Sequence, residues 1–519
     1  MIEPQVLNQV KGVLAKLSTT FTFVVERNLD DEKTTSYCNF VEDVASCSKL
    51  ITVQYREGRN FKFSIARNGE DTGISFSGIP NGHEFTSLLL ALLNGDGQGR
   101  NLPDAALTRR IKALQGDMQL KTYVSLTCTN CPDVVQALNV MALLNPAISN
   151  ETVDGALHQD EIEKLNIQAV PSVYINGDLL HVGRGTLGEL LEEIEEHMGV
   201  ASQAPGTANQ HAADLIVLGA GPAGVAAAIY AARKGQNVAL VAQRIGGQVN
   251  DTTGIENVIS VAKTTGTQLA ADLATHLAEY NIAVFNNRRV AHVDLTGKLK
   301  RVETRGGETI LAPKVIITTG AGWRRLGLPD EDKYIGHGIH FCPHCDGPFY
   351  KGKNVAVIGG GNSGAEAAID LAGTCKHVTL VEFSDKLKAD DVLQQKLQNM
   401  PNVDIITHCQ TTGLTGDGSK LTGIDVRDLK SGNEQHMALD GVFVQIGLKP
   451  NSDLFKGKIE MTPHGEIVVD DRNHTSVQGV YAAGDVTTTP FKQIMIAMGE
   501  GAKAALSAFE DSLYQTQDE

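Results

Sequence analysis

The sequence has little of what marks several large classes of protein. Eight cysteines in 519 residues are too few for a disulfide scaffold. Positive charge is in deficit, with a formal net charge of −16, which argues against nucleic acid as a partner because phosphate neutralisation requires a basic face. No run of Lys or Arg suggests an anionic membrane, and no charged-then-apolar signal peptide opens the chain. We therefore expect a soluble, cytoplasmic protein. The cytoplasm also keeps thiols reduced, which suits the closely spaced cysteine pairs of this chain.

Long apolar runs are also scarce. One stretch, 215–232, is long enough to raise the question of a membrane span, but it contains Pro222 and three glycines of one motif. A buried strand, loop and helix explain it better. The chain is instead rich in glycine, with 53 residues, which fits a fold with many tight strand-to-helix turns. Its length predicts several domains, because single cores rarely grow beyond about 300 residues.

The chain contains two glycine-rich loops. Each loop follows a short apolar strand and begins an alanine-rich helix, as in a dinucleotide-binding βα unit. The backbone of such a loop approaches a pyrophosphate at a helix N-terminus, where unpaired N–H groups attract negative charge. A purely structural glycine turn is the alternative, and the presence of two such loops disfavours it. The candidate binding residues are Gly219, Gly221 and Gly224 in the first loop and Gly359, Gly361, Asn362, Ser363 and Gly364 in the second.

In each dinucleotide-binding unit, the residue that follows the second strand predicts how the ribose of the dinucleotide is held. Gln243 follows the expected strand 237–241 and can accept a hydrogen bond from a ribose hydroxyl, but without the help of a charge. Glu382 follows the expected strand 377–381, 21 residues after Gly361. A carboxylate there binds both ribose hydroxyls and repels a 2′-phosphate, and no pair of arginines follows, so we predict NADH rather than NADPH. The alternative for Glu382 is a solvated charge at a strand end.

The first candidate redox centre is a CxxC pair close to the second glycine loop. Cys342 and Cys345 lie three apart, so on a helical turn both sulfurs share a face and can form a reducible disulfide. Asp346 is a candidate general acid for a departing thiolate, and His344 either tunes thiol acidity or is a spectator. The second glycine loop begins fourteen residues after Cys345, and a dinucleotide there can supply the two electrons that a disulfide needs.

The second candidate redox centre is the pair Cys128 and Cys131. It follows an expected strand at 120–126 and starts a helix, whose N-terminus stabilises a thiolate and makes Cys128 the predicted attacking sulfur. Pro171, which precedes another expected strand, fits the cis-proline that faces the dithiol in thioredoxin-like folds.

Zinc is the main competing interpretation of the CxxC pairs. Structural zinc sites place their pairs close together in sequence, whereas 210 residues separate Cys131 from Cys342. The cysteines without a motif are interpreted as small buried hydrophobes, although Cys38 and Cys47, nine apart, are also compatible with a vestigial redox site. These cysteines are Cys38, Cys47, Cys375 and Cys409.

The first 200 residues form an imperfect tandem repeat, with a strand, a helix, further strands and a closing helix in each copy. We expect a strand at 21–26, a helix at 32–46 and a closing helix at 84–93 in the first copy. The second copy closes with a helix near 186–197, and it alone carries a CxxC. The small and polar residues of 201–211 predict a flexible linker to the remainder of the chain.

Together these motifs resemble the family of alkyl hydroperoxide reductase F subunits, which are flavoproteins, over essentially the whole chain. Residues from about 212 onward resemble low-molecular-weight thioredoxin reductase, in which the redox CxxC lies in the nicotinamide nucleotide domain, as Cys342 and Cys345 do. In the glutathione reductase type it follows the first glycine loop. The resemblance implies an α/β fold with a tandem thioredoxin-like domain and two Rossmann-like domains. The implied boundaries are 1–198 (lobes about 1–100 and 101–198), a linker at 199–211, an FAD domain at 212–327 and 450–519, and an NADH and redox-disulfide domain at 328–449.

The resemblance also implies the cofactor and its contacts. FAD is expected on the first glycine loop, with Gln243 as a departure that weakens one contact. A homodimer through the FAD domains and a rotation of the NADH domain are further implications. His83 and Glu84 match a family segment near the N-terminal dithiol, and whether Glu84 accepts a proton from a cysteine stays open. The other implied FAD contacts are Gly246, Gly247, Gln248, Asn257, Gly484, Asp485, Lys492 and Gln493.

The resulting hypothesis is a flavin-dependent disulfide reductase. Electrons pass from NADH to FAD, then through Cys345 to the Cys342–Cys345 disulfide, then from Cys342 to Cys128–Cys131. Cys128 then reduces a peroxiredoxin of the kind that serves alkyl hydroperoxide reductase as its peroxide-destroying component. The alternatives are a thioredoxin reductase for general disulfides, an NADH oxidase that makes hydrogen peroxide, and a non-enzymatic redox sensor.

Overall fold

The structure is a computed structural model. It describes residues 2–27, 33–58, 61–99, 102–128, 130–167, 169–199, 210–251, 255, 258–329, 331–335, 337–341, 343–417 and 420–515. Two predicted site residues, Cys342 and Asn257, lie outside the described residues, as do the side chain of Cys345 and residues 201–209 of the expected linker. The chain divides into two compact units, Met1–Val200 with Arg325–Ile446 and Ala201–Arg324 with Gly447–Glu519.

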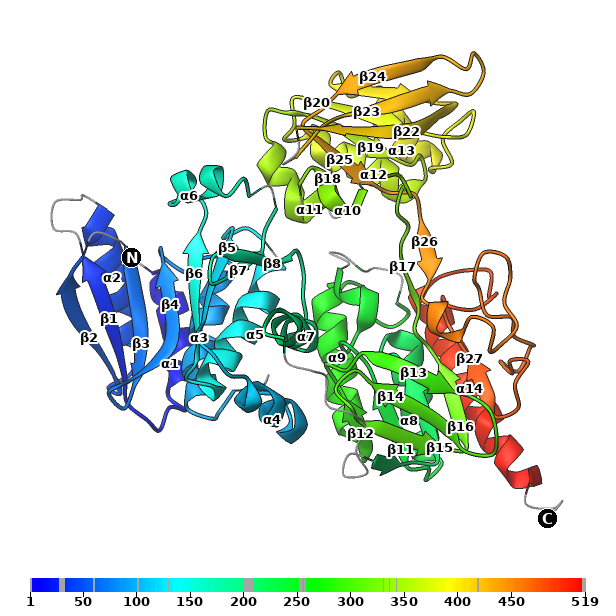
Figure 1. Ribbon diagram of the computed structural model, residues 1–519, viewed down its shortest axis with the longest axis horizontal. Coiled ribbons are helices and arrows are strands. Elements are labelled where there is room, and N and C mark those ends of the chain that lie inside the picture. Colours follow the sequence, from blue (N-terminus) through cyan, green and yellow to red (C-terminus); the bar gives the residue numbers. More distant parts are fainter. Residues whose placement is uncertain are drawn as a thin grey trace. The chain divides into compact units, whose positions relative to one another are not determined.

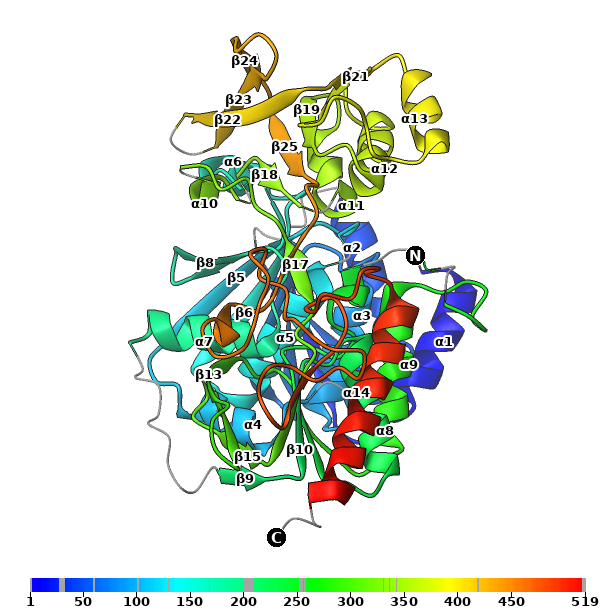
Figure 2. The same cartoon turned by 90° about the vertical axis from the view of Figure 1, so that its right-hand side faces the viewer.

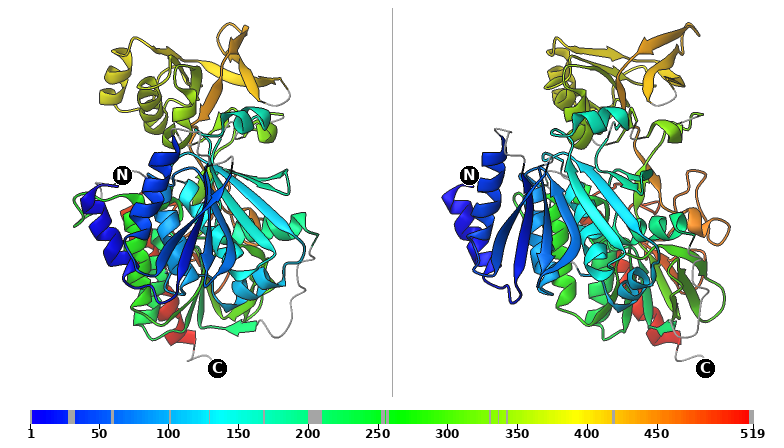
Figure 3. Two further views of the ribbon diagram at one scale, coloured as in Figure 1. Left: turned by 90° about the vertical axis from the view of Figure 1, so that its left-hand side faces the viewer. Right: turned by 60° about the vertical axis from the view of Figure 1, so that its left-hand side comes forward.

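The N-terminal 200 residues contribute one continuous sheet to the first unit. Its strands are β1 (Phe21–Arg27), β2 (Ile51–Glu57), β3 (Lys62–Arg67), β4 (Glu70–Ser77), β5 (Met118–Val124), β6 (Ile148–Asp154), β7 (Ser172–Ile175) and β8 (Asp178–Val182). They lie in the order β2-β1-β3-β4-β6-β5-β7-β8 (Figures 1 and 3).

The two halves of this sheet have the same topology. In each half, the first strand pairs parallel with the second and antiparallel with the third, and the fourth pairs antiparallel with the third. The halves join where β4 pairs parallel with β6. The shared order confirms the predicted tandem repeat, and β2, β3 and β4 are the further strands of its first copy.

Helices cover this sheet and link its halves. They are α1 (Pro4–Leu14), α2 (Lys33–Ala45), α3 (Glu84–Gly95), α4 (Ala105–Ala113), α5 (Cys131–Leu144), α6 (Gln159–Lys164) and α7 (Leu187–His197). α3, which closes the first half, packs against α5, which begins at the second cysteine of the CxxC. Thr186 and Glu189 form a capping box that fixes the start of α7.

Residues 325–446 form the remainder of the first unit. They fold as an α/β domain of the nucleotide-binding type. Its parallel sheet has the order β18-β25-β19-β20-β21, and β22, β23 and β24 form a separate antiparallel sheet. The second glycine loop lies between β19 and α12. The elements are α10 (Glu331–Tyr334), β18 (Ile339–His340), α11 (Pro343–Asp346), η3 (Gly347–Tyr350), β19 (Asn354–Ile358), α12 (Asn362–Ala372), β20 (His377–Val381), α13 (Asp391–Gln398), β21 (Val403–Ile406), β22 (Cys409–Gly416), β23 (Leu421–Asp428), β24 (Glu434–Ala438) and β25 (Gly441–Val444).

The second unit contains the first glycine loop, between β10 and α8. Its strands are β9 (Gln210–Ala212), β10 (Leu215–Leu218), β11 (Val238–Val241), β12 (Ile282–Phe285), β13 (Val290–Asp294), β14 (Lys300–Thr304), β15 (Thr309–Ala312), β16 (Lys314–Ile317), β17 (Ala321–Trp323), β26 (Leu448–Pro450) and β27 (Val480–Ala482). Its helices are α8 (Pro222–Arg233), η2 (Gly247–Asp251), α9 (Gly266–Ala278), η4 (Asp453–Phe455) and α14 (Ile494–Gln515). The parallel sheet has the order β12-β11-β10-β16-β27.

A buried strand with two apolar faces explains the packing of this unit. Leu215 and Val217 of β10 pack with the core under α8 and α14, whereas Ile216 and Leu218 pack with the core under β13–β15. α14 lies along α8 (Figure 2). The antiparallel pair β17 and β26 carries the chain out of this unit and back.

Three details bear on the predictions from sequence. The peptide bond between Val170 and Pro171 is cis, as predicted. The expected linker ends early, because Gln210–Ala212 form β9, which pairs with β15. Lys492 and Gln493, two of the implied FAD contacts, lie just before the last helix, α14. Among the described residues, no helix is both long and apolar enough to cross a membrane.

Candidate active site

The three glycines of the first loop have two different structural roles. Gly219 has φ +106°, and a Cβ there would lie 2.3 Å from the carbonyl oxygen of Thr318. A Cβ on Gly224 would lie 1.8 Å from the carbonyl oxygen of Gly219. Around Gly221, by contrast, no described protein atom comes within 4 Å of such a Cβ. The outer glycines thus allow the tight turn and close packing, and the middle one faces space that a pyrophosphate fits.

The second loop repeats this division. Gly359 has φ +117°, and its Cβ would lie 2.2 Å from the carbonyl oxygen of Gln445. A Cβ on Gly364 would lie 1.7 Å from the carbonyl oxygen of Gly359, and Gly361 again faces open space. Gly361 is also the N-cap of α12, so the helix N-terminus points at that space.

Two segments that were predicted to contact FAD meet at the first loop. A Cβ on Gly247 would lie 3.2 Å from the Cα of Gly221, and one on Gly484 would lie 3.0 Å from the Cβ of Ala223. Gln248 follows in η2, next to Gly246 and Gly247. Gln243 lies two residues beyond β11, at the carboxyl end of that strand. The structure therefore brings together most of the predicted flavin contacts that it describes.

Asp485 lies in the same place as a half-buried carboxyl group. Burial raises its pKa, and the charge of Lys492 opposes that effect. The Lys492 ammonium group itself donates to the carbonyl oxygen of Thr487 at 2.5 Å and pairs with Glu466 at 3.1 Å. The Asp485 carboxyl suits a hydroxyl-bearing ligand such as the ribityl chain of a flavin.

The expected ribose contact of the second loop is buried, so Glu382 is not a solvated charge. Its two oxygens accept hydrogen bonds from the backbone N–H groups of Gly360 at 2.6 Å and Ser384 at 2.8 Å. Burial opposes ionisation, but these donors outweigh it and lower the pKa of Glu382. Asn362 is paired with Asp390 through two hydrogen bonds of 3.0 and 2.8 Å, and Ser363 is exposed.

The N-terminal dithiol is buried. Cys128 is 1% and Cys131 0% exposed, and the Cys131 backbone N–H donates to the Cys128 sulfur at 3.2 Å. The hydrogen bond from the Cys131 thiol lowers the pKa of Cys128 most, against the effect of burial. Burial raises the pKa of Cys131. The geometry thus favours a thiolate at Cys128 and a thiol at Cys131.

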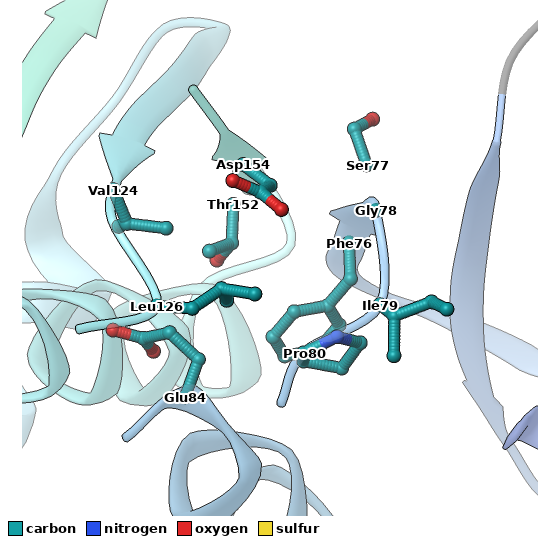
Figure 4. A pocket seen from close by; sticks show the side chains of 10 residues that line it. All are labelled: Phe76, Ser77, Gly78, Ile79, Pro80, Glu84, Val124, Leu126, Thr152 and Asp154. Atoms are coloured by element: carbon teal, nitrogen blue, oxygen red, sulfur yellow. The ribbon is translucent and has the colours of Figure 1, made fainter. Parts of the chain in front are cut away.

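A carboxyl group from the other lobe reaches this dithiol. Glu84 begins α3, is 0% exposed, and lies close enough to Cys131 to act on its titration. Among the described residues, neither Glu84 oxygen has a hydrogen-bond partner of ordinary geometry. Burial raises the pKa of Glu84 to about 7, offset in part by the Ser87 hydroxyl. Glu84 lines a small pocket between the lobes together with Leu126, Thr152 and Asp154 (Figure 4).

The start of α3 is attached to the segment before the CxxC. The His83 backbone N–H donates to the Leu126 carbonyl oxygen at 3.2 Å. Gly82 has φ +55°, and a Cβ there would lie 2.4 Å from that same oxygen. The packing of α3 on α5 and this attachment together explain why a residue of the first lobe belongs to the site of the second.

Asp346 follows Cys345 at the end of α11. One of its oxygens lies 3.1 Å from Nδ1 of the buried His340. The charge of Asp346 also acts on Cys128: it opposes ionisation of that thiol, although stronger effects lower the pKa of Cys128 overall. Within the first unit, the Asp346 carboxyl therefore lies near the N-terminal dithiol. Phe349 of η3 packs both in the nucleotide domain and against the core around Cys128.

Sequence patterns did not identify Phe349, His340 or the attachment at Gly82. Phe349 has no motif around it, and His340 precedes the CxxC without a spacing that marks a function. Phe349 and Gly82 gain their roles from segments distant in sequence. His340 contacts Tyr350 only ten residues further on, but no motif in the sequence marks that pair. The pairing of α3 with α5 is also a tertiary contact, which a repeat in the sequence does not specify.

Comparison with known proteins identifies the family. The pyridine nucleotide-disulphide oxidoreductase family profile matches residues 213–501, and a thioredoxin domain profile matches residues 118–196. The alkyl hydroperoxide reductase F subunit of Pseudomonas aeruginosa is 48% identical over 515 residues, which cover 98% of each chain. The same protein of Escherichia coli is 45% identical over 98% of each chain. The chain belongs to the family of alkyl hydroperoxide reductase F subunits.

Two further proteins, one known from its sequence and one from a solved structure, are similar to this chain. A Bacillus subtilis protein named NADH dehydrogenase is 48% identical over 482 residues, 93% of each chain. The solved thioredoxin reductase of T. acidophilum is 40% identical, with a TM-score of 0.53, and covers 58% of this chain and 99% of its own. The predicted resemblance and fold are therefore confirmed. As a member of this family, the chain is a flavin- and nicotinamide nucleotide-dependent disulfide oxidoreductase.

Proposed function

We propose that this enzyme passes electrons from NADH through FAD to Cys342–Cys345, then to Cys128–Cys131, and finally to a peroxiredoxin. The proposal rests on the name of its relatives, alkyl hydroperoxide reductase, and on the second dithiol that the thioredoxin-like lobe adds. The observation that carries it is the contrast at that dithiol. Cys128 has a lowered and Cys131 a raised pKa, which makes Cys128 the sulfur that attacks a partner disulfide.

FAD fits the second unit, and NADH fits the nucleotide domain. Bound FAD accepts a hydride from NADH and supplies two electrons to a disulfide. The backbone around Gly221 would hold its pyrophosphate, and Asp485 would accept a hydrogen bond from its ribityl chain. Gly361 and Glu382 would hold the nicotinamide nucleotide in the same way, and the buried Glu382 carboxylate disfavours a 2′-phosphate.

Asp346 and Glu84 are the proposed proton carriers of the two dithiols. Asp346 would protonate the Cys342 thiolate that leaves when Cys345 is attacked, and would take the proton back when Cys342 attacks Cys128–Cys131. Glu84, with a pKa of about 7, would exchange a proton with Cys131 in the same transfer. A carboxyl group that titrates near neutral pH can both give and accept a proton during one cycle.

The experiment that tests this function compares two electron acceptors. Replacing Cys128 by Ser is expected to abolish NADH-driven reduction of a peroxiredoxin and to leave reduction of a small dye intact. Cys38→Ser, at a half-buried cysteine of the first lobe, is the matched control and should change neither rate. If Cys128→Ser lost both activities, or neither, the proposed division between the two dithiols would be wrong.

Oxidation of NADH without a disulfide partner is the second candidate function. The B. subtilis relative named NADH dehydrogenase favours it. NADH-dependent oxygen consumption that persists undiminished in Cys128→Ser, with no stimulation by any disulfide, would establish it. Stimulation by peroxiredoxin in the original enzyme but not in the variant would exclude it as the main activity.

We further propose a homodimer through the FAD domain and a cytoplasmic location. Tyr230 on α8 and Leu506 and Leu513 on α14 are 40–54% exposed, and α8 and α14 pack together. Exposed apolar side chains on adjacent helices suit contact with a second copy of the same unit. Sedimentation velocity would test the dimer, and Leu513→Glu should produce monomers. The domain boundaries proposed from the sequence, 327/328 and 449/450, each lie three residues from the unit boundaries at 324/325 and 446/447.

A further inference from the structure

A buried histidine and a buried tyrosine behind Asp346 have no part in the transfers described so far. His340, the last residue of β18, is 2% exposed, and Tyr350, the last residue of η3, is 1% exposed. The Tyr350 hydroxyl lies 2.7 Å from Nε2 of His340. The Nδ1 atom of the same ring lies 3.1 Å from an oxygen of Asp346. The three side chains form one continuous polar chain that ends at the residue after Cys345.

The surrounding core holds the two rings in this arrangement. The Tyr350 ring packs edge-on against His340 and Phe443, with centroid distances of 5.2 and 5.6 Å. In β25, a Cβ on Gly441 would lie 2.3 Å from the Tyr350 ring, so the glycine makes room for it. Burying polar groups costs free energy unless they are hydrogen-bonded, and apolar side chains would fill this space without that cost.

The polar chain has a direction. A carboxylate oxygen of Asp346 can only accept, so the ring nitrogen that faces it, Nδ1, is the donor. Burial raises the pKa of Tyr350, so its hydroxyl keeps a proton that it can donate to Nε2 of His340. A neutral imidazole that accepts at Nε2 carries its proton on Nδ1, which faces Asp346. Among the described residues, the other titratable or charged groups that act on the pair are His337, Cys375, Asp440 and Lys353. Asp346 is the one that contacts the ring directly through a charged group.

We propose that His340 is a positioning residue for Asp346, and that Tyr350 fixes the tautomer in which His340 donates to it. The proposal rests on the proposed role of Asp346 as proton carrier of the Cys342–Cys345 pair. When two electrons break that disulfide, one proton moves from the Asp346 carboxyl to the departing Cys342 thiolate. When Cys342 attacks the next disulfide, the carboxylate takes the proton back. His340 neither gains nor loses a proton, and its Nδ1–H keeps the carboxyl oriented throughout.

A pH profile tests this role, because a merely structural residue would not move it. The measured rate is NADH-driven reduction of dithiobis(nitrobenzoate), from about pH 5 to 9. A donor to a carboxylate favours its ionised form, so His340→Leu should shift the profile upward by about one pH unit. It should also slow the reaction across the profile by about tenfold, because the carboxyl is no longer oriented for proton transfer. His340→Asn, whose amide can donate from a similar position, should restore most of the rate and of the profile.

Tyr350→Phe is the second variant, because it removes only one hydroxyl oxygen from the core. It should shift the profile in the same direction by a smaller amount, since it frees the imidazole to adopt the other tautomer. Flavin content and NADH-driven reduction of ferricyanide, which needs no thiol, verify that each variant folds. If His340→Leu does not fold, Tyr350→Phe decides the question.

The outcomes separate this inference from the function on which it rests. If Asp346→Asn reacts as fast as the original enzyme, the proposed role of Asp346 fails. If Asp346→Asn is slow but the His340→Leu and Tyr350→Phe profiles match the original, His340 does not position Asp346. A shifted profile in His340→Leu that His340→Asn reverses supports the proposal.

Discussion

Glu84 illustrates how burial alone changes the chemistry of a residue. The carboxyl comes from a lobe without a CxxC, and no charged partner among the described residues compensates for its removal from water. Its pKa of about 7 lies above the value of 4.5 that it has when unfolded. The folded protein therefore keeps a proton on Glu84 across a range in which the unfolded chain has lost it.

This difference predicts how stability depends on pH. The contribution of Glu84 is fully present below pH 4.5 and is lost as the pH rises through about 7. The loss amounts to about 3 kcal/mol, at about 1.4 kcal/mol for each pKa unit. Glu84→Gln should remove it, so that the variant is more stable than the original at pH 8 but not at pH 4. Unfolding of the full chain in urea at several pH values measures the effect.

An exposed glutamate provides the control for this experiment. Glu70 begins β4 and is exposed, so Glu70→Gln should leave the pH dependence of the unfolding midpoint unchanged. If Glu84→Gln showed the same pH dependence as the original chain, Glu84 would not be the proton-binding group. In the peroxiredoxin assay Glu84→Gln should also slow electron transfer to Cys128–Cys131, while dye reduction stays constant.

The residues that spacing predicts are those whose role is local. Gly221 and Gly361 lie at the second glycine of a motif, and the structure leaves open space at each. Glu382 follows its strand at the expected distance and is buried. Phe349 is different, because a contact with a distant segment, the core around Cys128, gives it its place. No periodicity in one stretch of chain records such a contact.

At the scale of elements, the first lobe supports the second through the start of α3. The tandem repeat could be predicted from the sequence because each lobe repeats the same order of strands and helices. The way the two lobes are joined could not be predicted, because the parallel pairing of β4 with β6 leaves no local signal in either strand. That join, with the packing of α3 on α5, puts Glu84 beside Cys131.

Gly82→Ala tests this support. A Cβ at Gly82 would lie 2.4 Å from the Leu126 carbonyl oxygen, so the start of α3 must move away from the segment before the CxxC. We expect a loss of stability of about 1–3 kcal/mol. Reduction of peroxiredoxin should also slow, because Glu84 moves with the helix. Thermal unfolding and the two-acceptor assay measure both effects.

Gly69→Ala is the matched control, because Gly69 also has a positive φ, +85°, but no described atom lies within 4 Å of the added Cβ. Both variants carry the strain of a left-handed alanine, and only Gly82→Ala adds the collision. Equal losses of stability and activity in the two variants would show that the attachment to Leu126 does not matter.

At the scale of the whole molecule, the proposed relay requires that the two dithiols come together and part again. Within the first unit, the N-terminal sheet meets the nucleotide domain at Phe349, and His337 forms a hydrogen bond with the Asn166 backbone. Asp346 lies near enough to act on Cys128 in this arrangement. In the part of the chain that the structure describes, this contact combines a partly buried aromatic ring with a polar pair. A contact of that kind suits a docking that must be reversible, because large apolar interfaces rarely separate.

Phe349→Ala should therefore slow the transfer between the dithiols without affecting earlier steps. Removing a packed aromatic ring from a contact typically costs about 2 kcal/mol, so reduction of peroxiredoxin should fall by about tenfold or more. Dye reduction should stay at the original rate, because it does not use Cys128. Leu429→Ala, at a residue of the same domain that is 37% exposed, controls for loss of apolar surface alone. An unchanged peroxiredoxin rate in Phe349→Ala would mean that the dithiols exchange electrons through a different contact, since the Phe349 ring packs both with the core around Cys128 and in the domain of Asp346.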